Sequence, residues 1–174
     1  MPASLSAIIV PMPSAEPVVG HHRAHHDAAA AWGVPAHVTV LYPFVAPAAI
    51  DEQVLARAGH AVSTVSPFDV AFAGPRWFGE SVLWLAPEPD TSFRALTAAL
   101  GDAFPEHPPY GGAFSEVVPH LTVGHDVDLD ELRRAKADVV GALPVHGRVE
   151  AAEVWTGDQA PGTWARLARL PLGG

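Results

Sequence analysis

Short apolar runs alternate with amphipathic stretches along the chain, and this pattern predicts a mixed α+β fold. Runs rich in β-branched or aromatic residues and bounded by proline or glycine predict strands over residues 5–10, 37–44, 68–73, 76–78, 81–86, 120–124, 145–155 and 163–170. Apolar residues at helical spacing predict helices over residues 14–31, 51–60, 91–104 and 128–143. The segment 105–119, rich in proline and glycine, is expected to form a loop.

Polar residues mark the ends of two of these helices. Ser14 is expected to cap the first helix, and Gly33 follows its end. Asp128 and Glu131 resemble a capping box at the start of the last helix. No low-complexity linker interrupts the pattern, so we expect residues 1–174 to form one domain.

One short pattern occurs twice. The residues from Pro35 to Val40 read PAHVTV, and those from Val118 to Val123 read VPHLTV. The two histidines, His37 and His120, lie 83 residues apart, which is close to half of the 174 residues. We interpret this spacing as a duplication, in which each half of the chain gives one motif to a shared cleft.

The repeated motif places an imidazole and a hydroxyl on one face of a strand. Because strand side chains alternate, His37 and Thr39 point the same way, as do His120 and Thr122, roughly 6–7 Å apart along each strand. Two imidazoles can serve as general base and general acid near neutral pH. The threonine hydroxyls can donate to phosphate oxygens. The four residues therefore suit phosphodiester chemistry without a metal.

These motifs resemble the paired His-hydrophobic-Thr/Ser-hydrophobic signature of the 2H phosphoesterase superfamily, and in particular the 2′-5′ RNA ligase-like proteins and RNA 2′,3′-cyclic phosphodiesterases. The resemblance implies two pseudo-symmetric α+β lobes of antiparallel sheet with flanking helices around a central cleft, with one motif in each lobe. It also implies metal-independent opening of 2′,3′-cyclic phosphates or cleavage of 2′-5′ linkages. His37 and His120 would form the acid/base pair, in an order left open, and Thr39 and Thr122 would bind phosphate.

Four further residues are candidates for binding substrate. Tyr110 lies in the proline- and glycine-rich loop before the second motif, where an aromatic ring could stack on a nucleobase or pin its own turn. Phe44, at the end of the first motif strand, has the same two interpretations. Arg76 and Arg148 lie on predicted strands and could hold phosphate or form exposed salt bridges.

Composition narrows the class of partner. Apolar residues make up 49% of the chain, charged residues only 17%, and the formal net charge is −9. This charge argues against long nucleic acids, and we expect a small nucleotide or an RNA terminus with a cyclic phosphate instead.

The sequence has no cysteine, which excludes disulfides, thiolate metal sites and cysteine nucleophiles. It also lacks a signal segment or membrane span, so we expect a soluble cytoplasmic monomer, and nine arginines against one lysine suggest a GC-rich bacterial genome.

Other patterns compete with this interpretation. His21, His22, His25 and His26 form two i, i+4 pairs that could bind a divalent metal, although a solvated helix face is the simpler explanation. His125 has the opposite parity to His120 and is expected to point away from it. The acidic run from Asp126 to Asp130 lacks the glycine and glutamate of a calcium loop, and no phosphate-binding or nucleophile-elbow motif is present. Two alternatives to the phosphoesterase remain: a non-catalytic nucleotide- or RNA-end-binding module on the same fold, and a zinc hydrolase that uses the histidine-rich helix.

Overall fold

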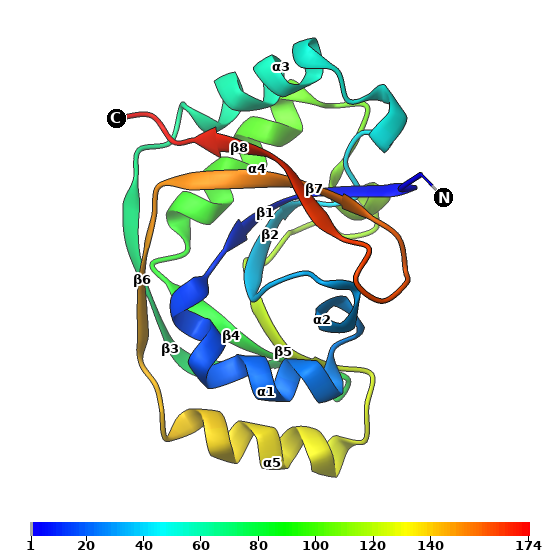
Figure 1. Cartoon of the computed structure of the whole chain (residues 1–174). Helices are drawn as coiled ribbons and strands as arrows, with labels where there is room; N and C mark the ends of the chain where they lie inside the picture. Colours follow the sequence, from blue (N-terminus) through cyan, green and yellow to red (C-terminus); the bar gives the residue numbers. More distant parts are fainter. Residues whose placement is uncertain (1) are drawn as a thin grey trace.

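The computed structural model describes residues 2–174 and shows a curled, eight-stranded antiparallel sheet flanked by helices (Figure 1). The strands are β1 (Leu5–Pro11), β2 (His37–Leu41), β3 (Phe68–Phe78), β4 (Val82–Glu88), β5 (Leu121–His125), β6 (Val145–Val149), β7 (Ala151–Gly157) and β8 (Ala165–Pro171). The α-helices are α1 (Glu16–His26), α2 (Ala28–Trp32), α3 (Glu52–Val62), α4 (Thr91–Ala103) and α5 (Leu129–Val140). Short 3₁₀ helices cover Pro13–Ala15, Pro47–Ala49 and Pro109–Gly112. The predicted α+β class with antiparallel sheet and flanking helices is confirmed.

The sheet consists of two half-sheets that meet at its centre. The strand order is β6-β3-β4-β5-β2-β1-β7-β8, so the two predicted motif strands, β2 and β5, are neighbours. We call β2, β1, β7 and β8 the first half-sheet, and β5, β4, β3 and β6 the second. In the described part of the chain, the strand pairing between the two half-sheets consists of the single residue pair Val38–Leu121.

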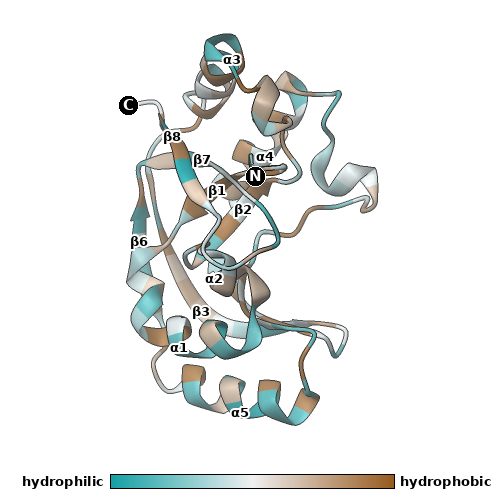
Figure 2. Cartoon of the chain, turned by 45° about the vertical axis from the view of Figure 1, so that its right-hand side comes forward, coloured by the Kyte–Doolittle hydropathy of each residue, from teal (hydrophilic) through white to brown (hydrophobic). Residues whose placement is uncertain are grey.

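The helices cover the two half-sheets crosswise. Helices α3 and α4 pack together against β8 and β2, at one end of the molecule, whereas α1 and α5 pack against β5 at the other (Figure 1). Helix α1 therefore follows a strand of the first half-sheet but covers the second. The helices carry both hydrophobic and hydrophilic residues (Figure 2), and their apolar sides join a core that contains Val19, Leu96 and Leu132.

The predicted first helix, residues 14–31, is broken into two. Ser14 does not cap it, because Ser14 lies inside the 3₁₀ turn Pro13–Ala15 and α1 begins after Ala15 without a side-chain cap. Asp27 has extended backbone angles, ends α1 and caps α2, accepting a hydrogen bond from Ala29 N at 3.1 Å. A carboxylate that bonds the following backbone amide favours a new helix start over continuation. The predicted cap of the last helix is confirmed, since Asp128 accepts from the amides of the first turn of α5.

Two predictions of strand boundaries are wrong, because strand pairing rather than local composition sets these boundaries. The run 145–155 reads as one strand but divides at Glu150 into β6 and β7, which lie in different half-sheets. Conversely, the predicted strands 68–73 and 76–78 form the single strand β3, with a register shift against β4 between Phe72 and Gly74. Among residues 2–174, no helix combines the length and apolar character needed to cross a membrane.

Candidate active site

The pairing of β2 with β5 determines where the two motifs lie relative to each other. Val38 pairs with Leu121 in an antiparallel register, which places His37 opposite Thr122 and Thr39 opposite His120. Val38 and Leu121 are fully buried in the core. Because side chains alternate along a strand, the four motif side chains lie on the opposite face of the sheet, where it curls inward. We call His37, Thr39, His120 and Thr122 the motif quartet.

Backbone carbonyls orient both imidazoles in the same way. His37 Nδ1 lies 2.7 Å from the carbonyl oxygen of Pro35, and His120 Nδ1 lies 2.8 Å from that of Val118. A carbonyl only accepts hydrogen bonds, so each Nδ1 carries a hydrogen and each Nε2 of the neutral ring is left as an acceptor. His37 Nε2 receives the Thr39 hydroxyl at 3.1 Å. Both rings can therefore exchange a proton at Nε2.

Burial favours the neutral form of both rings. Desolvation, followed by the positive charge of Arg23, lowers the pKa of His37 to about 4, and the hydrogen bond to Pro35 opposes this shift. Desolvation also lowers the pKa of His120, against its hydrogen bond to Val118. In the free protein both rings are thus proton acceptors at neutral pH.

Aromatic rings surround His120. The ring of Phe78 meets His120 edge to face, with centroids 5.0 Å apart, and stacks on Trp84 at 4.6 Å. Trp84 also contacts His120, at a centroid distance of 5.9 Å. Within residues 2–174 the buried Trp84 Nε1 has no hydrogen-bond partner. His120 is therefore held by aromatic packing in addition to its hydrogen bond to Val118, whereas His37 Nε2 has a polar contact to Thr39.

Tyr110 connects the loop before β5 to the first motif. Its amide donates to the carbonyl of Tyr42 at 2.6 Å, and its hydroxyl bonds to Thr39. The backbone of Tyr110 is in the left-handed region, with φ of 52°, which is strained for a bulky side chain. Burial raises the pKa of this phenol. The phenol of Tyr110 thus lies beside Thr39, which in turn contacts His37.

A cavity of about 550 Å³ opens beside His120. Its lining includes Phe78, Tyr110, Phe114 and His125. The expectation that His125 points away from His120 is wrong, because both line this cavity. The register of β4 with β5 shifts at this point, which adds one residue to β5 and reverses the alternation of its side chains.

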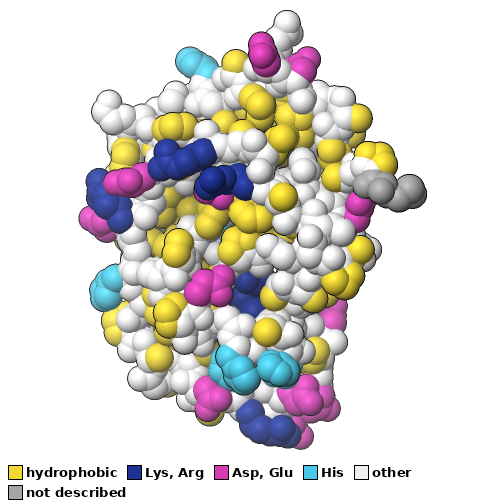
Figure 3. Space-filling model, in the orientation of Figure 1, with side chains coloured by type: hydrophobic (Ala, Val, Ile, Leu, Met, Phe, Trp, Pro, Cys, Tyr) yellow, Lys and Arg dark blue, Asp and Glu magenta, His cyan; other side chains and the backbone are white. Residues whose placement is uncertain are grey.

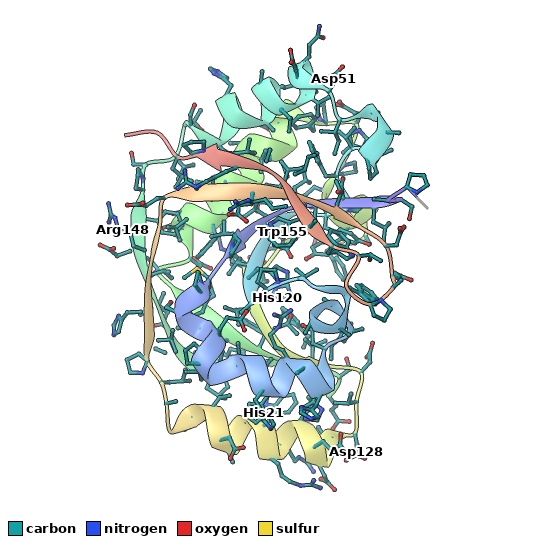
Figure 4. All side chains as sticks on the ribbon, in the orientation of Figure 1. His21, Asp51, His120, Asp128, Arg148 and Trp155 are labelled. Carbon is teal, nitrogen blue, oxygen red and sulfur yellow. The ribbon has the colours of Figure 1, made fainter. Side chains whose placement is uncertain are left out.

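Of the other predicted binding residues, Arg76 shares a sheet face with the motif quartet, whereas Phe44 and Arg148 lie elsewhere. Arg76 pairs with Trp84, which in turn pairs with Thr122, so its exposed side chain lies on the same face as the motif quartet. Phe44 is not brought to the site: it is 4% exposed and its ring packs on Phe104 in the core. Arg148 lies on the edge strand β6, far from His120, and bonds Asp69 at 3.1 Å (Figure 4).

The histidine cluster, formed by His21, His22, His25 and His26, belongs to α1, over which histidine atoms lie on the surface (Figure 3). His21 lies apart from His120 (Figure 4). His21 and His25 are close, with ring centroids 4.7 Å apart. His22 and His26 instead face acidic residues of α5, with His22 Nε2 3.6 Å from Asp138 and His26 Nδ1 3.7 Å from Glu131. In the described residues, no group of three or more His, Cys, Asp or Glu is arranged to hold a metal ion.

Sequence reasoning missed Arg23. This residue is only 2% exposed, in the last turn of α1, and its Nε bonds Asp27 at 3.0 Å. The available signal was the i, i+4 spacing of Arg23 and Asp27, which predicts an ion pair but not its burial.

Comparisons with known proteins identify the family and the fold of the chain. The family model of the 2′-5′ RNA ligase superfamily matches residues 10–161. The chain belongs to this superfamily. Escherichia coli LigT complexed with 3′-AMP is similar in structure, with a TM-score of 0.65 and 15% identity, over 99% of this chain and 100% of LigT. LigT complexed with NADP+ gives a TM-score of 0.64 and 17% identity, over 100% of both chains.

Two further solved structures have a similar fold. A protein described as a phosphoesterase has a TM-score of 0.61 and 18% identity, over 98% of this chain and 99% of its own. A protein of Thermus thermophilus has a TM-score of 0.61 and 16% identity, over 98% of both chains. Comparison with curated protein sequences finds no significant match. At these identities the structures establish a fold shared with the LigT-like members of the superfamily.

Proposed function

We propose that the protein is a metal-independent phosphoesterase that opens 2′,3′-cyclic phosphates or cleaves 2′-5′ phosphodiester linkages. The observation that carries the proposal is the register of β2 with β5. It places each motif histidine directly across from the threonine of the other motif, His37 from Thr122 and His120 from Thr39. The whole chain then acts as one bilobal unit, with one motif from each half-sheet.

In this proposal the motif quartet supplies the acid, the base and the phosphate-binding hydroxyls. One neutral imidazole takes a proton from water at Nε2 as the water oxygen bonds to phosphorus. The bond from phosphorus to a ribose oxygen breaks, and the other imidazole, protonated at Nε2, gives its proton to that oxygen. Each proton transfer contributes roughly 10²–10⁴-fold to the rate. The hydroxyls of Thr39 and Thr122 donate to the non-bridging oxygens, where negative charge is held in the transition state.

A bound phosphate favours protonation of one imidazole, which can then serve as the proton donor. Both imidazoles are neutral in the free protein at neutral pH because burial lowers each pKa. A phosphate anion next to an imidazole favours its protonated form and raises its pKa. Substrate binding is therefore coupled to uptake of one proton from solvent by one of the two rings.

The surroundings of the motif quartet support a nucleotide as substrate. The cavity beside His120 is lined by the aromatic rings of Phe78, Tyr110 and Phe114, on which a base can stack. Phe114 is 63% exposed at this cavity and its ring contacts Tyr110, with centroids 5.6 Å apart. Arg76, on the same face, is the candidate for a second phosphate contact. LigT, one of the structural relatives, is complexed with 3′-AMP and NADP+.

The decisive experiment is hydrolysis of 2′,3′-cyclic mononucleotides and of an oligonucleotide ending in a cyclic phosphate, in the presence of EDTA. We expect turnover that EDTA does not reduce and that His37→Ala and His120→Ala each lower by at least about 10²-fold. His60→Ala, on the exposed face of α3, is the matched control and should keep wild-type activity. Turnover that persists in both motif variants, or that EDTA abolishes, would contradict the proposal.

The low pKa of both imidazoles also favours a second candidate, a module that binds nucleotide or RNA ends without turnover. Without a proton donor in the free protein, the motif quartet can hold a phosphate through its hydroxyls alone. This alternative predicts that wild type binds 2′-AMP or 3′-AMP in a calorimeter, that Thr39→Val weakens binding, and that no cyclic substrate is hydrolysed.

A further inference from the structure

Arg23 is a buried cation next to the first motif that the proposed mechanism does not use. Its Nε bonds Asp27 at 3.0 Å and its Nη1 donates to the carbonyl of Val34 at 3.1 Å. Its Nη2 is buried and, in the described chain, has no hydrogen-bond partner. Burying a guanidinium costs several kcal/mol unless its surroundings compensate. Such a group requires a structural or functional explanation.

Helix α1 holds the segment that leads into β2. Glu16, in its first turn, accepts a hydrogen bond from Ala36 N at 2.6 Å, and Arg23, in its last turn, donates to Val34. The carbonyl between these two anchors belongs to Pro35 and accepts the hydrogen bond from His37 Nδ1. The orientation of the His37 ring therefore depends on backbone that α1 fixes from both sides.

We propose that Arg23 is a positioning residue of the active site, which fixes the backbone that orients His37 and supplies the positive charge that makes His37 the proton acceptor of the pair. This inference rests on the proposed function, because the role of proton acceptor has meaning only in a two-histidine reaction.

The charged and titratable groups around His37 make the two histidines unequal. Arg23 of α1 and His120 of β5 oppose protonation of His37, whereas Asp27, at the junction of α1 and α2, favours it, and the effect of Arg23 is the largest of the three. The pKa of His120 is affected by one titratable neighbour, His125. When a phosphate anion enters, His120 is the ring that gains the proton.

The proposal then assigns the general base to His37 and the general acid to His120. His37 Nε2 takes the proton of the attacking water while its oxygen bonds to phosphorus. The phosphorus–ribose oxygen bond breaks, and His120 Nε2 delivers its proton to that oxygen. The Arg23 charge is fixed before substrate arrives, so no reorganisation is needed during the reaction.

Two variants that break the same ion pair test the proposal. Arg23→Gln removes the positive charge and leaves Asp27, so it should raise the pKa of His37 by about one pH unit. Asp27→Asn removes the negative charge, keeps an oxygen to cap α2, and should lower the pKa of His37. Arg23→Lys keeps the charge but loses the guanidinium fork, so it should leave this pKa low and reduce kcat. The imidazole of His37 is titrated by NMR in each protein.

The outcomes separate this inference from the proposed function. Opposite shifts in the two variants support it, and the acidic limb of kcat/KM should then move with the His37 titration. Shifts in the same direction, or none, overturn it, because a purely structural ion pair would affect both variants alike. If Arg23→Gln does not fold, an unchanged or raised pKa in Asp27→Asn has the same meaning. Absence of turnover in wild type would refute the proposed function, whereas the titrations still decide the electrostatic role of Arg23.

Discussion

Replacing Thr39 by valine tests the most heavily used hydroxyl of the site. Valine has nearly the same shape but cannot donate a hydrogen bond, so it removes the contact to His37 Nε2 at 3.1 Å and the contact to Tyr110. In the free protein the Thr39 hydroxyl donates a hydrogen bond to His37 Nε2, and in the proposed complex it donates instead to a phosphate oxygen. The variant therefore loses a donor that matters most in the transition state.

The magnitude follows from comparable donors. Loss of one preorganised donor to a developing oxyanion lowers kcat by about 10²–10³-fold, equivalent to about 3–4 kcal/mol. Thr39 shares the phosphate with Thr122, so we expect the lower end, about 10²-fold in kcat/KM. Stability should change by only about 1 kcal/mol, because an uncharged hydrogen bond contributes roughly 0.5–1.5 kcal/mol net.

The assay is steady-state hydrolysis of a 2′,3′-cyclic mononucleotide by wild type, Thr39→Val and Thr39→Ser. Serine keeps the hydroxyl and should retain activity within a few-fold of wild type. Thermal unfolding of each protein separates lost chemistry from lost fold. Equal kcat/KM for the valine and serine variants would refute the reasoning, since only the hydroxyl distinguishes their polarity.

Three further predictions follow from contacts described above. The free energy of unfolding should fall by about 2–3 kcal/mol as the pH drops from 6.5 towards 4, because the unfolded chain protonates His37 (usual pKa 6.5) before the native state does (pKa about 4). Denaturant titrations should show that His37→Gln weakens this dependence on pH, and an unchanged dependence in the variant would count against a neutral buried ring. Tyr110→Phe keeps the ring but removes the hydroxyl on Thr39 and should lower kcat/KM roughly 5–10-fold, whereas full activity would mean that the hydroxyl is dispensable. Gly124→Ala places a methyl group 2.5 Å from Leu132 Cδ2 and should destabilise the protein by about 1–3 kcal/mol in thermal melts; an unchanged midpoint would show that α5 can yield.

The parts of this fold that depend on local pattern could be predicted from the sequence. Alternation of apolar and polar residues located both motif strands, and the apolar spacing located α4 and α5 to within a few residues. The resemblance carried by the two motifs gave the fold, and the match of the family model confirms that relationship. Local pattern succeeds where one residue's environment is set by its neighbours in the chain.

The remaining features depend on contacts that the chain makes at a distance. The division of residues 145–155 between two half-sheets follows from which strands are available to pair, not from their composition. The reversed side of His125 follows from one extra residue in β5. Burial of Arg23 arises because the segment before β2 folds back over α1. None of these three features can be recognised from the spacing of apolar and polar residues along the chain.

The crosswise placement of the helices has a consequence for how the protein can be divided. Helix α1 belongs by sequence to the first motif but covers the sheet of the second, and α4 lies just before the second motif but packs on β2 of the first. Each half therefore exposes an apolar surface unless the other half is present. We expect fragments cut between β4 and α4 to be insoluble alone and to recover a folded species only when mixed. If the chain arose by duplication, each copy now depends on a helix of the other to cover its sheet, so neither copy could be lost without unfolding the one that remains.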